Sequence, residues 1–133
     1  HVALADARKG VGMFQMDAIQ VPVLGIVENM AYFTPAELPD MKYYLFGKEG
    51  AQQLAYQQEV PFLGEVPLIQ SIREAGDVGH PAALQTQGPS VEAFKQVTQN
   101  MITALTDRIE NFPPTEAVRI TTMAGCKTTP RNA

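Results

Sequence analysis

The stretch VPVLGIVEN, residues 21–29, and its echo VPFLGEVP, residues 60–67, decide the fold. Both runs begin with the pattern V-P-x-L-G-x-V. The first run is continuous, apolar and rich in β-branched side chains over residues 21–27, which is typical of a strand covered on both faces. Between the runs, residues 46–59 carry apolar side chains at helical spacing, at Ala51, Leu54 and Ala55. Strand, helix and strand in this order predict a right-handed crossover between parallel strands.

The residues before the first strand predict an amphipathic helix. Its apolar positions recur at helical spacing, at Ala3, Leu4, Ala7, Val11, Phe14 and Ala18. Gly10 and Gly12 lie inside this segment, where each glycine weakens an exposed helix by roughly 1 kcal/mol relative to alanine. We therefore expect both glycines to allow close packing against a neighbouring backbone.

Two more helices are predicted after the second strand. A short one in residues 69–81 should end near Gly76 or Gly79, because Pro81 cannot continue it. A long one should start with Ser90 as its N-cap and end near Asn111. Its inward positions are expected at Val91, Phe94, Val97, Met101, Leu105 and Ile109. Alternation at Val118, Ile120 and Thr122 then indicates an edge strand, and we expect residues 126–133 to be a disordered tail.

The composition limits the class of protein. With 45% apolar and 18% charged side chains in 133 residues, we expect one globular unit and no membrane span. The net charge of -4 provides no basic stripe for a phosphate backbone, so no nucleic-acid partner is expected. The single Cys126 cannot form an intramolecular disulfide, which favours a reducing, cytoplasmic setting. Because an apolar pattern follows His1 at once, we expect a fragment of a longer protein.

Polar and backbone groups follow the two predicted strands at one edge of the sheet. Parallel strands end on the same rim, where open α/β proteins bind ligands, so Asn29 and Pro67 should converge. The amide of Asn29 offers a donor beside an acceptor, which matches the N6 and N7 edge of adenine. Backbone groups of residues 66–69 could satisfy the other base edge. A second interpretation stays open, in which Asn29 caps the strand end through local backbone hydrogen bonds.

A resemblance to a known family rests on five motifs in this order: VALADARKGVGMF, VPVLGIVENMAYF, FGKEGAQQLA, VPFLGEVPL and IREAGDVGHP. Together they resemble the C-terminal half of the Mrp/ApbC-type P-loop ATPases, which carry iron–sulfur clusters. The similarity extends over residues 2–83, and the weaker pattern of residues 90–122 fits the family's last helix and strand. The implied fold is the C-terminal part of an α/β parallel-sheet NTPase of the deviant Walker A group, over residues 1–125.

The resemblance also implies a ligand and partners. ATP with magnesium would be held at the interface of a homodimer that hydrolyses it, and clusters would pass to iron–sulfur client proteins. By this resemblance Asn29 contacts the adenine, and the base is bordered by Val66, Pro67, Leu68 and Ile69. Asp77 is expected near the same pocket, although a helix-end cap or a solvent-exposed charge is an equally open role for it.

The family's phosphate-binding loop does not occur in these 133 residues. In RKGVGMF the lysine precedes the glycines and no serine or threonine follows, so this segment cannot replace the loop. The chain would then supply only the base-recognition half of a nucleotide site. Because phosphoryl transfer depends on charges positioned by the missing loop, we assign no catalytic residue and expect no ATP hydrolysis by this chain alone.

The family's cysteine pair is missing as well. After the Asn-Met strand end, most members carry C-x-x-C, whose thiolates bind a cluster between two subunits. Here Thr34, Pro35 and Ala36 occupy that stretch, as in variant members, so we expect no metal site there, and the isolated Cys126 does not restore one. The aromatic residues nearby either form a hydrophobic dimer contact or pack on their own subunit; they are Tyr32, Phe33, Tyr43, Tyr44 and Phe46.

Two other functions stay open. A partition-type or septum-site-type ATPase would keep the same fold and switch a dimer or a membrane association, but the sequence has no basic amphipathic helix suited to membrane docking. A non-enzymatic interaction module would instead use the aromatic segment. Nucleotide binding separates the ATPases from the interaction module, and cluster transfer separates the two kinds of ATPase.

Reconstitution with iron and sulfide tests the missing cysteine pair. We expect no stable cluster on this chain, because none of Thr34, Pro35 and Ala36 supplies a thiolate. The measurement is the visible absorption of the desalted chain, compared with that of its Cys126→Ser variant. A cluster that forms and is abolished by Cys126→Ser would make the C-terminal tail a ligand, contrary to this expectation.

Overall fold

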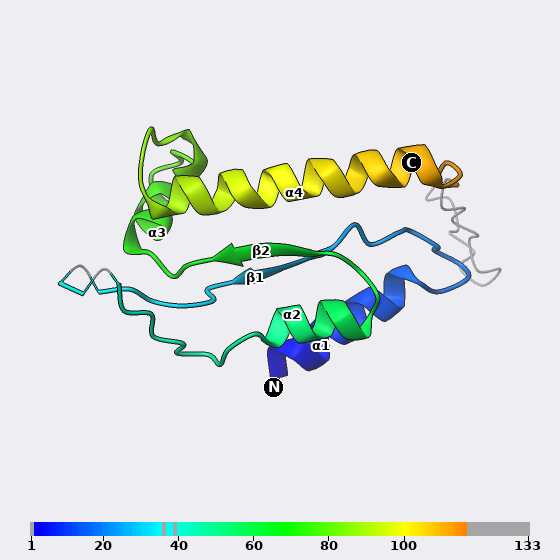
Figure 1. Cartoon of the computed structure of the whole chain (residues 1–133), viewed down its shortest axis with the longest axis horizontal. Helices are drawn as coiled ribbons and strands as arrows, with labels where there is room; N and C mark the ends of the chain where they lie inside the picture. The colour runs from blue at the N-terminus through cyan, green and yellow to red at the C-terminus, as the bar shows by residue number, and fades with distance from the viewer. Residues whose placement is uncertain (1, 36, 39, 117–133) are drawn as a thin grey trace, which may run out of the picture.

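The structure is a computed structural model that describes residues 2–35, 37–38 and 40–116. The elements in chain order are α1 (Val2–Phe14), β1 (Ile26–Asn29), α2 (Gly50–Gln57), β2 (Phe62–Val66), α3 (Gln70–Asp77), the 3-10 helix η1 (Ala82–Leu84) and α4 (Pro89–Asn111). Within these residues a two-stranded sheet lies between α4 on one face and α1 with α2 on the other (Figure 1). The chain therefore has the predicted α/β architecture.

Strands β1 and β2 pair in parallel, which confirms the crossover predicted through α2. Opposite residues are Val27 and Gly64, Glu28 and Glu65, and Asn29 and Val66. Before β1, a Cβ added to Gly25 would lie 2.6 Å from the carbonyl oxygen of Pro61. The two backbones can come this close only because Gly25 has no side chain, and this contact sets where the pairing begins.

The tightest packing is between α2 and the sheet. Leu54 and Ala55 of α2 are 2% and 1% exposed, and Leu63 of β2 is 6% exposed. Leu54 and Ala55 thus confirm the predicted helix face. Because the crossover helix lies on the strands that it connects, the order strand, helix, strand produces the core directly.

Helix α4 covers the other face of β2. A Cβ added to Gly64 would lie 3.2 Å from the side chain of Val97. The Asn100 side chain donates a hydrogen bond of 2.8 Å to the carbonyl of Leu63. This helix residue therefore satisfies a strand carbonyl next to the shift in register between Ile26 and Val27.

The prediction for the first strand was only partly right. Residues 21–25 are not in a strand, and Val27 is 36% exposed, so β1 is not covered on both faces. Within the described residues β1 has one neighbouring strand, β2, and its other edge has no partner strand. A strand at the edge of a sheet leaves one row of backbone groups without a ladder partner, and its faces are buried only where helices or loops cover them.

The expected role of the glycines in α1 was wrong. A Cβ on Gly10 or Gly12 would meet no heavy atom within 4 Å among the described residues, so neither glycine serves close packing. Helix α1 ends at Phe14, before Ala18, and Val11 is its buried residue. The spacing of apolar residues correctly predicted the helix α1. Spacing alone does not show which residues the apolar side of this helix contacts.

The start and the inward side of α4 also differ from the prediction. Gly88 occupies the N-cap position and Ser90 lies inside the first turn, because Pro89 needs no N–H partner there. Met101, Leu105 and Ile109 are 41%, 42% and 69% exposed. Val91, Phe94 and Val97 are half-buried, as predicted, and the half-buried side continues through Asn100, Ala104 and Arg108 instead of the predicted residues. Which side of the helix faces β2 depends on contacts distant in sequence, and the spacing of apolar residues does not show it.

Helix α4 does end at Asn111, as predicted. The predicted edge strand at residues 118–122 and the tail at residues 126–133 lie outside the described residues. No helix in the described part of the chain is both long and apolar enough to cross a bilayer.

Two glycine substitutions should have opposite effects on stability. Gly25→Ala places a methyl group against the backbone of Pro61 and should lower the free energy of unfolding by about 1–3 kcal/mol. Gly12→Ala, in open space within α1, should raise it by about 0.5–1 kcal/mol. Urea denaturation followed by circular dichroism measures both. Equal effects would show that Gly25 does not fix the approach of the strands.

Candidate functional site

The C-terminal ends of β1 and β2 lie side by side. Asn29 is opposite Val66, and beyond the strands the Ala31 N–H donates to the Val66 carbonyl at 3.0 Å. The Leu68 N–H then donates to the Tyr32 carbonyl at 2.7 Å. The structure therefore brings Asn29 together with residues 66–68, the convergence that parallel strands predicted.

The side chain of Asn29 is exposed and makes a local hydrogen bond. Its Oδ1 accepts from the N–H of Met30 at 3.0 Å, and Met30 has a left-handed backbone with a φ of 55°. This is the strand-end cap that sequence reasoning left open. Among the described residues no hydrogen bond engages the Nδ2 of Asn29, so its two donor hydrogens face outward to any ligand.

Residues 66–69 follow β2 beyond this amide, and only some of their backbone groups are hydrogen-bonded within the described residues. Val66 is 5% exposed and Pro67 is also buried. Ile69 takes the N-cap position of α3 with an extended backbone, and its N–H makes no hydrogen bond within the part of the chain that the structure describes. A planar ligand beside Asn29 would thus find a free backbone donor at Ile69.

Asp77, the other residue expected near the base, lies in the last turn of α3. It ends α3, about 12 Å along the helix axis from Ile69. Its carboxylate accepts a hydrogen bond of 2.6 Å from Arg73, one helical turn earlier, and both side chains are more than half exposed, at 61% and 64%. In this structure Asp77 holds an exposed ion pair on α3.

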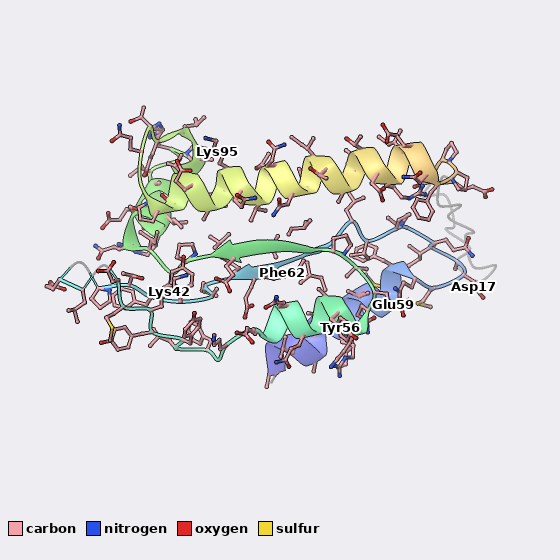
Figure 2. All side chains as sticks on the ribbon, viewed as in Figure 1. Asp17, Lys42, Tyr56, Glu59, Phe62 and Lys95 are labelled. Carbon is pink, nitrogen blue, oxygen red and sulfur yellow. The ribbon has the colours of Figure 1, made fainter. Side chains whose placement is uncertain are left out.

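The aromatic segment, residues 31–46, is called the excursion below. Phe33 and Tyr43 pair in antiparallel fashion, with hydrogen bonds of 2.9 and 2.8 Å. The rings of Tyr32 and Tyr44 meet edge to face with centroids 6.2 Å apart. The ammonium of Lys42, a residue labelled in Figure 2, lies 3.9 Å from the centre of the Tyr32 ring. Such contacts hold a hairpin without metal ligands.

Part of the excursion packs on its own chain and part faces outward. Phe33, Tyr43 and Phe46 are 39%, 42% and 72% exposed. Tyr32 and Tyr44 are only half-buried, although their rings touch. Tyr32 and Tyr44 therefore pack on their own chain, whereas a dimer contact through the exposed aromatic residues stays a prediction.

Sequence reasoning missed a pair of carboxylates on the α2 face of the sheet. Glu28 lies opposite Glu65, and one oxygen of Glu28 is buried without a hydrogen-bond partner in the described residues. Aligning the two V-P-x-L-G-x-V runs would place Ile26 opposite Glu65, so no signal in the pattern indicated this pair. Close by, the carboxylate of Glu49 raises the pKa of Lys48, with smaller contributions from Tyr44 and Glu65.

No metal centre accompanies these groups in the part of the chain that the structure describes. It contains no group of three or more histidine, cysteine, aspartate or glutamate side chains placed to hold a metal ion. Thr34 and Pro35 supply no thiolate at the place where the resembling family has its cysteines.

Comparison with known proteins relates the chain to a defined group. The model of the ParA family described as "NUBPL iron-transfer P-loop NTPase" matches residues 1–102. An iron-sulfur cluster carrier protein of Synechocystis is 45% identical over 101 residues, which are 75% of this chain and 28% of that protein.

Eukaryotic relatives are similar over a comparable stretch. The mitochondrial iron-sulfur protein required for NADH dehydrogenase of Arabidopsis thaliana is 40% identical over 111 residues, which are 83% of this chain and 34% of that protein. The iron-sulfur cluster transfer protein NUBPL of Mus musculus is 38% identical over 107 residues, 78% of this chain and 32% of that protein. The chain thus spans about a third of the length of its curated relatives.

Removing the carboxylate of Asp77 should have little effect on stability. Because Arg73 and Asp77 form an exposed pair one turn apart, Asp77→Asn should change the free energy of unfolding by less than about 0.5 kcal/mol. Urea denaturation of both proteins gives the difference. A loss above about 1 kcal/mol would mean that Asp77 contributes more to the fold than an exposed ion pair does.

Proposed function

The chain belongs to the family of NUBPL-type iron-transfer P-loop NTPases, and we propose that it supplies the base-recognition part of an ATP-dependent iron–sulfur cluster carrier. The observation that carries this proposal is the convergence of Asn29 with residues 66–68 at the ends of two parallel strands. Ligands of open α/β sheets bind at such strand ends. The family relationship supports ATP as the nucleotide.

Asn29 and Ile69 are the groups suited to a purine base. The Nδ2 of Asn29 can donate to N7 of adenine while its Oδ1 accepts from the N6 amine, whereas guanine presents two acceptors, N7 and O6, at the same edge. The backbone N–H of Ile69 can donate to a second ring nitrogen. Val66, Pro67 and Leu68 would then border the base. The Val66 carbonyl and the Leu68 N–H are already hydrogen-bonded to Ala31 and Tyr32 of the excursion, so they would line the edge of the base without bonding to it.

The residues of this chain fit the base but not the phosphates or magnesium. The sequence has no glycine-rich loop followed by lysine and serine or threonine, and the described residues offer no cluster of carboxylates arranged for a metal. We propose that residues 1–125 are the C-terminal portion of the ATPase and that the phosphate grip comes from other parts of the full-length protein. ATP bound there supplies a hydrolysable phosphoanhydride.

The cargo site differs from that of cysteine-bearing members. A cluster needs thiolate ligands, and Thr34, Pro35 and Ala36 provide none. We derive no cluster-binding step from the excursion. Its exposed aromatic residues instead support a protein contact, either between two copies in a homodimer or with an iron–sulfur client, as proposed from the names of the relatives.

We propose that the full-length protein is a cytoplasmic homodimer without nucleic-acid or membrane partners. The Arabidopsis relative is named as mitochondrial. A partition-type ATPase would use the same base site but would not transfer clusters. A pure interaction module would use the excursion and bind no nucleotide.

Replacement of Asn29 tests the base site. In the full-length protein Asn29→Ala should remove a preference for ATP over GTP worth about 1–3 kcal/mol, because one bidentate base contact is lost while the phosphate grip is kept. Equilibrium binding of both nucleotides gives the ratio of affinities. Asn111→Ala is the matched control, since among the described residues the Asn111 side chain donates only to Asp107, at the end of α4. An unchanged ratio in a folded Asn29→Ala protein would leave Asn29 as a strand-end cap.

A further inference from the structure

The ladder between β1 and β2 contains one extra residue on β2. The pairs on either side of it are Ile26 with Phe62 and Val27 with Gly64, so Leu63 has no partner residue on β1. Gly64 has a φ of 135°, in the region of backbone conformations that favours glycine. An unpaired residue next to a glycine of this conformation is a β-bulge, and the bulged residue lies outside the regular ladder.

Helix α4 holds this bulge through the side chain of Asn100. The Nδ2 of Asn100 donates to the Leu63 carbonyl at 2.8 Å, although the two residues are 37 apart in the sequence. The Nε2 of Gln96, one helical turn earlier, donates to the Oδ1 of Asn100 at 3.0 Å. With its oxygen directed to Gln96, the amide directs its nitrogen to the strand. Leu63 is 6% exposed and Asn100 is half-buried, so a variant without this donor leaves the carbonyl in a poorly hydrated place.

The bulge sets which residue of β2 lies opposite Asn29. With Leu63 outside the ladder, Asn29 pairs with Val66. If Leu63 entered the ladder, every later pair would move by one residue, and Asn29 would lie opposite Glu65. One residue along a strand is about 3.3 Å, whereas a binding group must be held to within about 0.5 Å of its productive position. The convergence of Asn29 with residues 66–68 therefore depends on the bulge.

We propose that Asn100 is a positioning residue for the base site, an inference that rests on the proposed function. Asn100 lies on α4 and acts through the strand, because its hydrogen bond to Leu63 keeps β2 in the register that places Asn29 beside Val66. Loss of the donor to this carbonyl shifts the equilibrium from bulged towards regular pairing by about five- to hundredfold. Gln99 is the matched control, because it carries the same kind of side-chain amide on the exposed side of α4.

Hydrogen exchange of the full-length protein without nucleotide provides the first test. Three backbone N–H groups report on the register: that of Ile26 is hydrogen-bonded before the bulge, and those of Ala31 and Leu68 are hydrogen-bonded after it. Asn100→Ala and Asn100→Asp both remove the donor, since an ionised carboxylate has no hydrogen to donate. In both variants we expect exchange at Ala31 and Leu68 to become about five- to hundredfold faster while exchange at Ile26 stays the same. Gln99→Ala should change none of the three.

A residue that only stabilises the fold would give a different pattern of exchange. Loss of global stability speeds exchange at Ile26, Ala31 and Leu68 alike, because all three groups then exchange through complete unfolding. Equal acceleration at all three, or no acceleration in either variant, overturns the positioning role.

Nucleotide binding by the full-length protein provides the second test. Asn100→Ala should lower the ratio of ATP to GTP affinity about threefold or more, whereas Gln99→Ala should leave this ratio unchanged. Because Asn100 acts through Asn29, adding Asn100→Ala to Asn29→Ala should not lower the ratio further. A further fall in the double variant would show that Asn100 acts by another route, which overturns the inference.

The two proposals can fail separately. If Asn29→Ala abolishes the preference for ATP but Asn100→Ala keeps it, the base site stands and the positioning role is wrong. If neither substitution alters the ratio of affinities, the proposed base contact of Asn29 fails, and Asn100 positions no base even where exchange shows that it holds the register.

Discussion

The parallel pairing of β1 with β2 is the interaction on which the rest of the structure depends. Gly25 allows the backbones to meet at Pro61, and Asn100 of α4 satisfies the Leu63 carbonyl beside the shift in register. Helix α2 follows from this pairing, because a crossover between parallel strands must lie on one face of their sheet. The two strand ends meet for the same reason, and the groups proposed to recognise the base converge there.

The described part of the excursion is a hairpin held by its own backbone and aromatic contacts. A cluster between thiolates holds such a loop by strong metal–sulfur bonds, whereas this hairpin is held by the backbone bonds of Phe33 and Tyr43 and by the contact of Lys42 with Tyr32. These contacts are individually weak, worth about 1 kcal/mol each.

Local patterns predicted some elements well and others poorly. The repeated V-P-x-L-G-x-V runs identified both strands and their parallel order, and Leu54 and Ala55 marked the buried side of α2. The repeat could not predict the register of the two strands. Aligning the runs would place Val27 opposite Val66, whereas Val27 pairs with Gly64, two residues earlier. For α4, the spacing of apolar residues could not show which side faces β2, since that depends on contacts distant in sequence.

By itself the sequence determined that two parallel strands end in Asn29 and Pro67, and that neither a phosphate loop nor a cysteine pair accompanies them. These properties follow from the identity of the residues and from their short-range periodicity, neither of which depends on the tertiary structure. Only the tertiary structure decided that Glu28 lies opposite Glu65, that Asp77 pairs with Arg73 away from Asn29, and that the Asn29 amide turns back onto Met30. Register and side-chain orientation depend on contacts between distant segments, so the local pattern of apolar and polar residues does not specify them.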